Sequence, residues 1–201
     1  LFPADLPVIP GLADRHFHST AMADRGLDPA EILIELRRHN AGPMVDEAIQ
    51  PEDAARQREF TGSVPDVRYT MGLHPVSSGR EDWQQALELI HRELATGRYH
   101  AVGETGLDWY RMYAPRERQL ALFEEHLKYA NTFRLPVIVH NRDADEDCLA
   151  LLQAHPPVAG GVMHCYSSDP LWVEPFLDAG MYISFAGNVT FRKADVLREA
   201  A

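Results

Sequence analysis

Short apolar runs alternate with amphipathic stretches along almost the whole chain. Seven of the runs have the length of buried strands, and none shows the long polar and apolar alternation of a solvated antiparallel sheet. The predicted strands are Gly11–His16, Met44–Ile49, Val67–Gly72, Ala101–Glu104, Val137–His140, Gly161–His164 and Met181–Ser184. Because strands that alternate with helices usually form a parallel sheet covered by those helices, the pattern predicts an α/β fold.

The stretches between the predicted strands carry helix signals. The segment Asp28-Pro29-Ala30-Glu31 offers a capping residue, a proline at the first helical position and a glutamate at the third. It predicts a helix that buries the apolar positions Ile32, Leu33 and Leu36. Two further apolar stripes at helical spacing are Trp83, Ala86, Leu87, Ile90 and Leu94, and then Leu120, Phe123, Leu127 and Ala130. We interpret these stripes as core.

Seven strand–helix units fit either an open doubly wound sheet or a barrel that lacks its last unit. An open nucleotide-binding sheet is expected to carry a glycine-rich loop after an early strand, whereas the first strand here ends in Asp14-Arg15-His16-Phe17-His18. Polar residues instead follow the C-terminal ends of several strands, as in barrel enzymes. We therefore expect a TIM-type (β/α) barrel truncated after its seventh strand, with residues 1–201 forming one domain.

Composition narrows the class of protein. The chain has 201 residues, of which 45% are hydrophobic, and no stretch approaches the roughly 18 uninterrupted apolar residues of a membrane span. The net charge of −11 argues against a broad basic surface that coats nucleic acid, although bound metal ions could still attract phosphate. Cys148 and Cys165 fit reduced thiols better than a disulfide framework. We expect a cytoplasmic protein with no membrane association and no obligate protein partner.

Candidate metal ligands stand at the ends of four predicted strands. His16 and His18 are two residues apart, so their imidazoles point to the same side of an extended strand. Three more strands end in Glu104, His140 and His164. Titratable side chains are disfavoured inside a barrel unless they are paired or bind metal. The pattern predicts a divalent-metal site, and imidazoles with a carboxylate suit Zn, Mn, Fe or Mg.

Five short motifs in this order resemble the TatD family of metal-dependent deoxyribonucleases. They are Asp14-x-His16-x-His18, Gly72-Leu73-His74-Pro75, Gly103-Glu104-Thr105-Gly106-Leu107-Asp108, His140-Asn141-Arg142-Asp143-Ala144 and His164-Cys165-Tyr166-Ser167. The resemblance implies a centre of two divalent ions, Mg, Mn or Zn, that activates water to hydrolyse DNA or another phosphodiester. It implies that Glu104 reaches both ions, that His16 and His18 hold one ion, and that His140 and His164 hold the other.

Three residues are candidates for substrate binding. The resemblance suggests that His74 faces the substrate, although a role in a turn is the alternative. Arg142 could hold a phosphate oxygen bidentately, unless it forms a salt bridge with Asp143 or Asp145. Arg111, in the loop after the fourth strand, could meet a nucleic-acid backbone or lie on a solvated face.

Two other functions compete with this interpretation. A lactonase or amidohydrolase barrel often bridges its metals with a carbamylated lysine, but the only lysines are Lys128, in a helical pattern, and Lys193, after the last strand. A non-catalytic remnant of the fold is the second competitor. The intact set of candidate ligands argues against such a remnant.

Two departures from the family pattern lead to further expectations. Arg15 and Glu47 are unusual residues on neighbouring strands, and we expect them to form an ion pair. The family also has an Asp ligand at the end of its final strand. Asp195 is no substitute because residues 195–199 have a helical pattern. We therefore expect the chain to be a C-terminally truncated part of a longer protein, with weaker metal binding on the His16 side.

Overall fold

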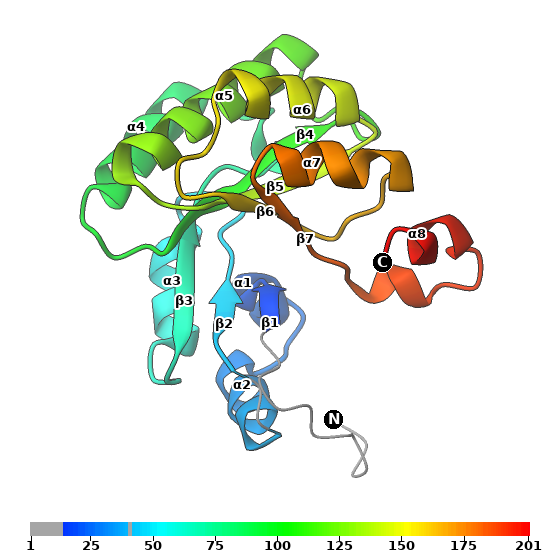
Figure 1. Cartoon of the computed structure of the whole chain (residues 1–201). Helices are drawn as coiled ribbons and strands as arrows, with labels where there is room; N and C mark the ends of the chain where they lie inside the picture. Colours follow the sequence, from blue (N-terminus) through cyan, green and yellow to red (C-terminus); the bar gives the residue numbers. More distant parts are fainter. Residues whose placement is uncertain (1–13, 40–41) are drawn as a thin grey trace.

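The computed structural model describes residues 14–39 and 42–201, and its strands form one parallel sheet in sequence order. These strands are β1 (Asp14–Phe17), β2 (Met44–Asp46), β3 (Val67–Met71), β4 (Ala101–Asp108), β5 (Val137–Arg142), β6 (Gly161–Met163) and β7 (Met181–Ile183). The sheet is curled, with β1–β3 turned away from β4–β7 (Figure 1). In the described residues the predicted barrel fold is thus confirmed as a curled, seven-stranded half-barrel.

Helices follow the strands in turn and cover the outside of the curled sheet. The α-helices are α1 (Ser19–Asp24), α2 (Pro29–Arg38), α3 (Asp53–Thr61), α4 (Trp83–Leu94), α5 (Arg116–Phe133), α6 (Asp145–Ala154), α7 (Val173–Asp178) and α8 (Asp195–Glu199). Short 3-10 helices are η1 (Pro75–Ser77), η2 (Pro170–Trp172) and η3 (Gly187–Thr190). In Figure 1, α4 to α7 lie on one side of β4 to β7. The C-terminal ends of the strands are therefore available to form a site.

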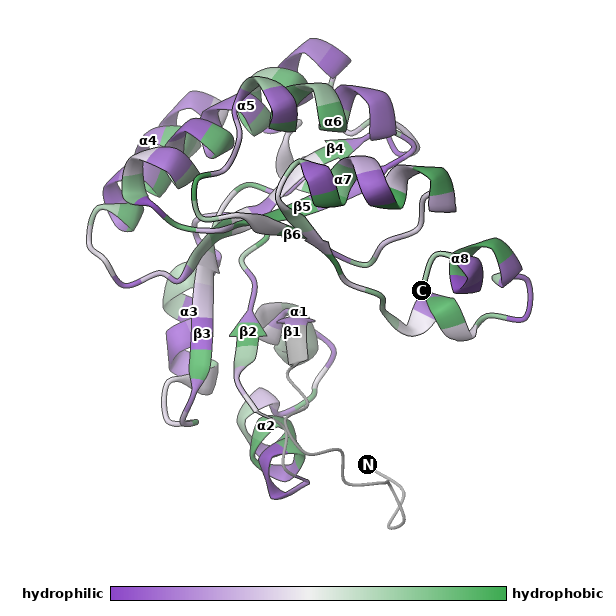
Figure 2. Ribbon diagram, in the orientation of Figure 1, coloured by the Kyte–Doolittle hydropathy of each residue, from purple (hydrophilic) through white to green (hydrophobic). Residues whose placement is uncertain are grey.

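The main core lies between β4 to β7 and their covering helices. Most residues of the two predicted stripes are buried there, namely Ala86, Leu87, Ile90 and Leu94 of α4 and Phe123, Leu127 and Ala130 of α5, whereas Trp83 and Leu120 are partly buried. Figure 2 shows hydrophobic and hydrophilic positions on the same helices, as expected for elements with one face in the core. Cys148 belongs to this core, and neither it nor Cys165 is in a disulfide.

A smaller cluster holds the first strands. The Asp28 side chain caps α2 by accepting a hydrogen bond from the Glu31 N–H over 3.1 Å, and Pro29 occupies the first position, as predicted. In α2 only Leu33 of the three expected apolar residues is fully buried, against Met44, Val64 and Val67. Ile32 and Leu36 are partly buried. Fewer buried hydrophobic side chains therefore pack against β2 in this cluster than against β4 to β7 in the main core.

The observed strand ends differ most from the predicted ones in β2 and β4. β2 stops at Asp46, because the N–H of Ala48 donates to the Thr70 hydroxyl instead of a backbone carbonyl. β4 continues past Glu104 to Asp108, because the residues after a register shift still pair with β5. The longer β4 therefore brings both Glu104 and Asp108 beside β5.

The C-terminal part of the described chain forms a helix, as the sequence predicted. In α8, the exposed Asp195 pairs with Arg198 on the helix surface, which agrees with its exclusion as a metal ligand. No helix in residues 14–39 and 42–201 is both long and apolar enough to cross a membrane.

Candidate metal centre

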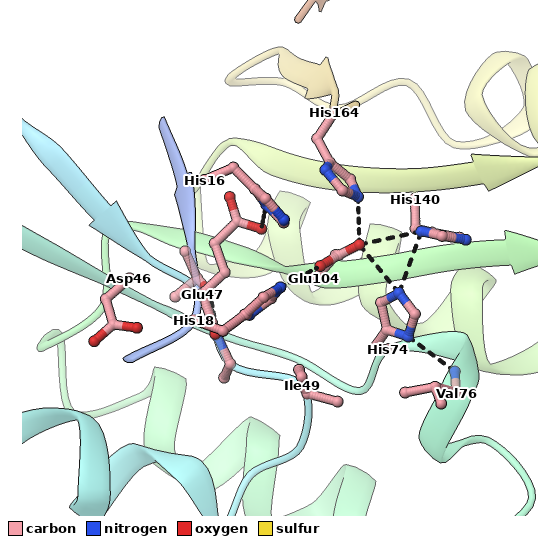
Figure 3. A network of polar contacts seen from close by, with 12 residues as sticks. His16, His18, Asp46, Glu47, Ile49, His74, Val76, Glu104, His140 and His164 are labelled. Atoms are coloured by element: carbon pink, nitrogen blue, oxygen red, sulfur yellow. Dashed lines mark hydrogen bonds and ion pairs between the residues drawn. The ribbon is translucent and has the colours of Figure 1, made fainter. Parts of the chain in front are cut away.

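The five predicted ligands come together at the C-terminal ends of β1, β4, β5 and β6 (Figure 3). His16 belongs to β1, Glu104 to β4 and His140 to β5, while His18 and His164 directly follow β1 and β6. In Figure 3 the histidine rings surround the Glu104 carboxylate. The structure thus brings together side chains that are far apart in the sequence.

Glu104 is the centre of this cluster. Its Oε1 lies 3.1 Å from His74 Nε2 and 3.2 Å from His140 Nδ1, and it also contacts His164 Nε2. Its Oε2 lies 3.5 Å from His18 Nε2. Burial acts to raise the pKa of Glu104, but the surrounding histidines, above all His164 and His74, bring that pKa well below its ordinary value. The carboxylate is therefore ionised and has imidazole nitrogens near both oxygens.

Two groups of three potential ligands share Glu104. His16, Glu104 and His164 form one group, and His74, Glu104 and His140 form the other, with the donor atoms of each group within 4.8 Å of one another. The rings of His16 and His164 stack with centroids 4.1 Å apart. Among the described residues this grouping differs from the one that the resemblance implies, because His74 joins His140 and His18 stands outside both groups.

The donor set fits a divalent cation. His164 is buried, and neither of its ring nitrogens makes a hydrogen bond of ordinary geometry. Its Nε2 nevertheless lies next to the Glu104 carboxylate. A cation bound between them could be coordinated by both the imidazole nitrogen and the carboxylate oxygen. Several imidazoles around one buried carboxylate are typical ligands for a metal of this kind.

Asp108 is a further member of the site, although the sequence argument gave it no role. Its Oδ2 lies 3.2 Å from His140 Nε2, on the side of the ring away from Glu104. Burial acts to lower the pKa of His140, but the two carboxylates outweigh burial and raise that pKa to about 9. Asp108 therefore orients His140 from behind, and the sequence signal was the family motif that ends at this aspartate.

Glu47 is a second residue of the site whose contacts with the cluster the sequence argument did not predict. Its Oε2 lies 2.7 Å from His16 Nδ1, and its backbone carbonyl lies 2.8 Å from His18 Nδ1. The expected ion pair with Arg15 lies outside the described residues, because the Arg15 side chain is not among them. A carboxylate on the strand next to a His-x-His pair was the available signal.

Two glycines let β4 approach β5 closely enough to bring Glu104 and His140 together. Gly106 has a φ of +132°, and a Cβ atom there would lie 2.0 Å from the carbonyl oxygen of His140. Gly103 has a φ of +150°, and a Cβ atom there would lie 2.8 Å from the carbonyl oxygen of Ile138. Only glycine fits both the backbone conformation and the spacing.

His74 lies at the edge of the cluster, where the chain enters η1. Its Nδ1 accepts a hydrogen bond from the Val76 N–H over 2.9 Å, so its Nε2 faces Glu104 and His140. Burial lowers the pKa of His74 in spite of the nearby Glu104. The neutral imidazole of His74 therefore lies between Glu104 and the start of η1.

The two arginines that we expected to bind substrate share one aromatic partner. The Arg142 guanidinium lies 4.0 Å from the ring centroid of Tyr110, and the Arg111 guanidinium lies 5.5 Å from it. Among the described residues, no ion pair joins Arg142 to Asp143 or Asp145. The Tyr110 side chain is exposed, so this cationic and aromatic surface is open beside Asp108.

The lysines lie away from the cluster. Lys128 is on α5 and pairs with Glu124 and Glu125, while Lys193 is exposed after η3. Neither of these residues can bridge metals in the place of Glu104. The geometry therefore gives no support to a lactonase or amidohydrolase centre built on a carbamylated lysine.

Comparison with known proteins identifies similar chains. The family model for TatD related DNase matches residues 13–201. The chain is 33% identical over 193 residues to the uncharacterized metal-dependent hydrolase YcfH of Escherichia coli K12, covering 94% of this chain and 72% of that protein. It is 30% identical over 165 residues to the 3'-5' ssDNA/RNA exonuclease TatD of a Rahnella strain, covering 81% of this chain and 62% of that protein.

A solved structure has the same arrangement of strands and helices. The crystal structure of YJJV, a TatD homologue from Escherichia coli K12, superposes with a TM-score of 0.78 at 26% sequence identity. The match covers 94% of this chain and 73% of the other.

Proposed function

The chain belongs to the TatD related DNase family and is a metal-dependent hydrolase, and from this premise we propose that it cleaves phosphodiester bonds in single-stranded nucleic acid. The observation that carries the proposal is the buried, ionised Glu104, which is surrounded by imidazoles at the ends of parallel strands. In barrel enzymes this end of the sheet holds the catalytic site. The proposal extends the family activity to a substrate class.

We assign five metal ligands, which are His16, His18, Glu104, His140 and His164. Glu104 is the shared ligand in this assignment, because imidazole nitrogens approach both of its oxygens. When bound, two divalent ions of the Mg, Mn or Zn type would provide water of lowered pKa and stabilise charge on the departing oxygen. Asp108 holds His140 in a fixed orientation for this site. His74, as a neutral group at the edge of the cluster, is assigned to substrate contact.

The surface beside Asp108 supports a single-stranded substrate. Arg142 and Arg111 can contact phosphate oxygens, and the exposed Tyr110 ring can stack on an unpaired base. A base inside a duplex has its faces covered by its neighbours, so stacking on Tyr110 favours a strand end or a single strand. The Rahnella relative, which is named as a single-strand exonuclease, supports the same class.

The proposal is tested by removing metal from the purified protein and adding back Mg, Mn or Zn one at a time. Metal content is measured together with hydrolysis of end-labelled single-stranded DNA, single-stranded RNA and duplex DNA. We expect metal-dependent cleavage that is faster on single strands. Glu104→Gln should lose cleavage, whereas Glu125→Gln, a change at the helix surface near Lys128, should keep it.

Two results would overturn the proposal. Metal-dependent hydrolysis of lactones or amides without any cleavage of nucleic acid would favour the amidohydrolase type of barrel. Failure of the wild-type protein to bind metal or to turn over any ester would favour a non-catalytic remnant of the fold.

A further inference from the structure

The residue after β2 lies directly beside the His-x-His pair of β1. Phe17 and Asp46 are register partners, and the N–H of Glu47 donates to the carbonyl of Phe17 over 2.8 Å. The backbone of Glu47 is thereby fixed next to both His16 and His18. Its side chain is fully buried, so it is directed into the protein and away from solvent.

Glu47 contacts the two imidazoles through different groups. Its side-chain Oε2 lies 2.7 Å from His16 Nδ1, and its main-chain carbonyl lies 2.8 Å from His18 Nδ1. A carboxylate and a carbonyl are both hydrogen-bond acceptors, so each imidazole donates its Nδ1–H. In a neutral ring the proton on Nδ1 leaves Nε2 with a free lone pair. Both histidines therefore have the tautomer that binds a cation through Nε2.

The direction of the rings agrees with this assignment. His18 Nε2 lies 3.5 Å from Glu104 Oε2, and His16 belongs to the ligand group that contains Glu104. Figure 3 shows Glu47 on the side of His16 and His18 away from Glu104. Glu47, directly after β2, thus contacts both rings on the side away from Glu104.

We propose that Glu47 is a positioning residue of the metal centre, which holds His16 and His18 in the Nε2-binding tautomer before metal arrives. The inference rests on the ligand set proposed above and adds a residue to it. Acceptors behind metal-bound histidines fix the ring orientation and make the ligand nitrogen more basic. Of these two rings, the carboxylate contacts that of His16, whereas the main chain of Glu47 contacts that of His18.

Because the two rings contact different groups of Glu47, substitutions of its side chain should affect His16 and His18 differently. Glu47→Ala removes the acceptor of His16 but keeps the backbone carbonyl that His18 uses. Glu47→Gln keeps an oxygen acceptor and removes the charge. We therefore expect His16 to lose its fixed tautomer in Glu47→Ala and to recover it in part in Glu47→Gln, while His18 stays unchanged in both variants.

The tautomers are read from the ring ¹⁵N chemical shifts of His16 and His18 in the metal-free protein. Affinity for Zn²⁺ and Mn²⁺ is measured by competition with a chromophoric chelator. We expect the wild-type protein to show Nδ1–H in both rings. Affinity in Glu47→Ala should be about 10- to 100-fold weaker, as is typical when such an outer partner is removed, with a smaller loss in Glu47→Gln.

Asp53→Asn is the matched control. Asp53 is a buried carboxylate at the start of α3, and it accepts hydrogen bonds from the N–H groups of Ile49 and Gln50 in the connection that follows Glu47. A loss of stability without a change at His16 should result from this variant. If Glu47→Ala is too unstable to study, Glu47→Gln alone still tests the proposal through its metal affinity and the His16 shift.

The proposal is wrong if His16 keeps the same tautomer and the metal affinity is unchanged in Glu47→Ala. It is also wrong if His18 changes as much as His16, because the two rings use different groups of Glu47. Failure of the wild-type protein to cleave nucleic acid would remove the proposed substrate, but the tautomers in the metal-free protein would still decide the role of Glu47.

Discussion

The N–H of Leu73 donates a hydrogen bond to Nε2 of His126 over 3.0 Å, which joins helix α5 to the segment that carries His74. Nδ1 of His126 donates to the carbonyl of Leu122 over 2.7 Å, so the ring is neutral, with its proton on Nδ1. The ring is completely buried. An uncharged histidine in the core thus holds the backbone next to His74, whose side chain contacts Glu104.

This contact predicts a loss of stability in mild acid. Burial lowers the pKa of His126 from 6.5 to about 4. The unfolded chain therefore binds a proton at higher pH than the folded one, and the contribution of His126 to stability is complete above pH 6.5. It falls as the pH drops from 6.5 towards 4, by about 3 kcal/mol in total. The measurement is the free energy of unfolding in denaturant at pH 7.5 and at pH 4.5, with metal removed.

His126→Gln separates this contribution from that of other titrating groups. The variant should be less stable than the wild type at pH 7.5, because one buried hydrogen bond has to be rebuilt. The difference between the two proteins should shrink at pH 4.5, since only the wild type has a histidine to protonate. A difference that stays constant across this range would contradict the assignment of a neutral, buried ring.

A methyl group at Gly106, inside the site, should have a larger effect than a methyl group at a glycine with open space around it. The Cβ of alanine would lie 2.0 Å from the carbonyl oxygen of His140, so β5 has to move away from β4. We expect Gly106→Ala to lose metal binding and several degrees of melting temperature. Gly97→Ala is the control, because Gly97 has a φ of +71° but no atom within 4 Å of the added Cβ. Equal effects in both variants would mean that backbone conformation alone, without the clash, explains the loss.

Sequence periodicity predicted the strands, and titratable residues at the ends of four of them predicted a cluster of candidate metal ligands. Both signals can be recognised within a few neighbouring residues. A buried strand is a short apolar run, and a polar residue is tolerated where that strand ends. Glu104, His140 and His164 were therefore expected to lie together from their positions in the chain, and the structure brings them together. The extension of β4 to Asp108 was not predicted, since it depends on pairing with β5 after a register shift.

The missed or altered roles all depend on contacts between distant segments. The contact between the Glu47 carboxylate and the imidazole of His16 was not predicted, and the expected ion pair of Glu47 with Arg15 stays a prediction because the Arg15 side chain is not among the described residues. The contact of His74 with Glu104 was likewise not predicted, and its role in substrate binding stays a prediction. These contacts depend on the orientation of the rings and on the curvature of the strands. Neither can be predicted from the spacing of residues in the sequence.

The shared position of Glu104 predicts a hierarchy among the ligand variants. Glu104→Ala removes the one carboxylate that faces four imidazoles, so it should abolish hydrolysis more completely than any single histidine-to-alanine change. Glu104→Gln keeps the shape but removes the charge, and it should also lose metal. The measurements are metal content and cleavage rate for each variant. Near-wild-type cleavage in Glu104→Ala would exclude a shared carboxylate ligand.

Arg142 predicts a change in substrate use that leaves the metal centre intact. Its guanidinium packs on Tyr110 at 4.0 Å from the ring centroid, beside Asp108 but outside the ring of imidazoles. We expect Arg142→Ala to raise KM for single-stranded DNA by about 10-fold or more, as for the loss of a charge-assisted contact, with unchanged metal content. Arg142→Lys should recover little, because an ammonium group neither stacks as a plane nor binds phosphate bidentately.

The matched control is another arginine that packs on a tyrosine. Arg58 lies 5.9 Å from the ring centroid of Tyr99 and also donates to its hydroxyl. Tyr99 precedes the first residue of β4, whereas Glu104 lies further along this strand. Arg58→Ala should cost some stability and leave KM unchanged. Tyr110→Phe should behave as the wild type and Tyr110→Ala as Arg142→Ala, because stacking needs the ring but not its hydroxyl. Loss of metal in Arg142→Ala would instead make Arg142 part of the structure that holds His140, and the phosphate contact would have to be assigned elsewhere.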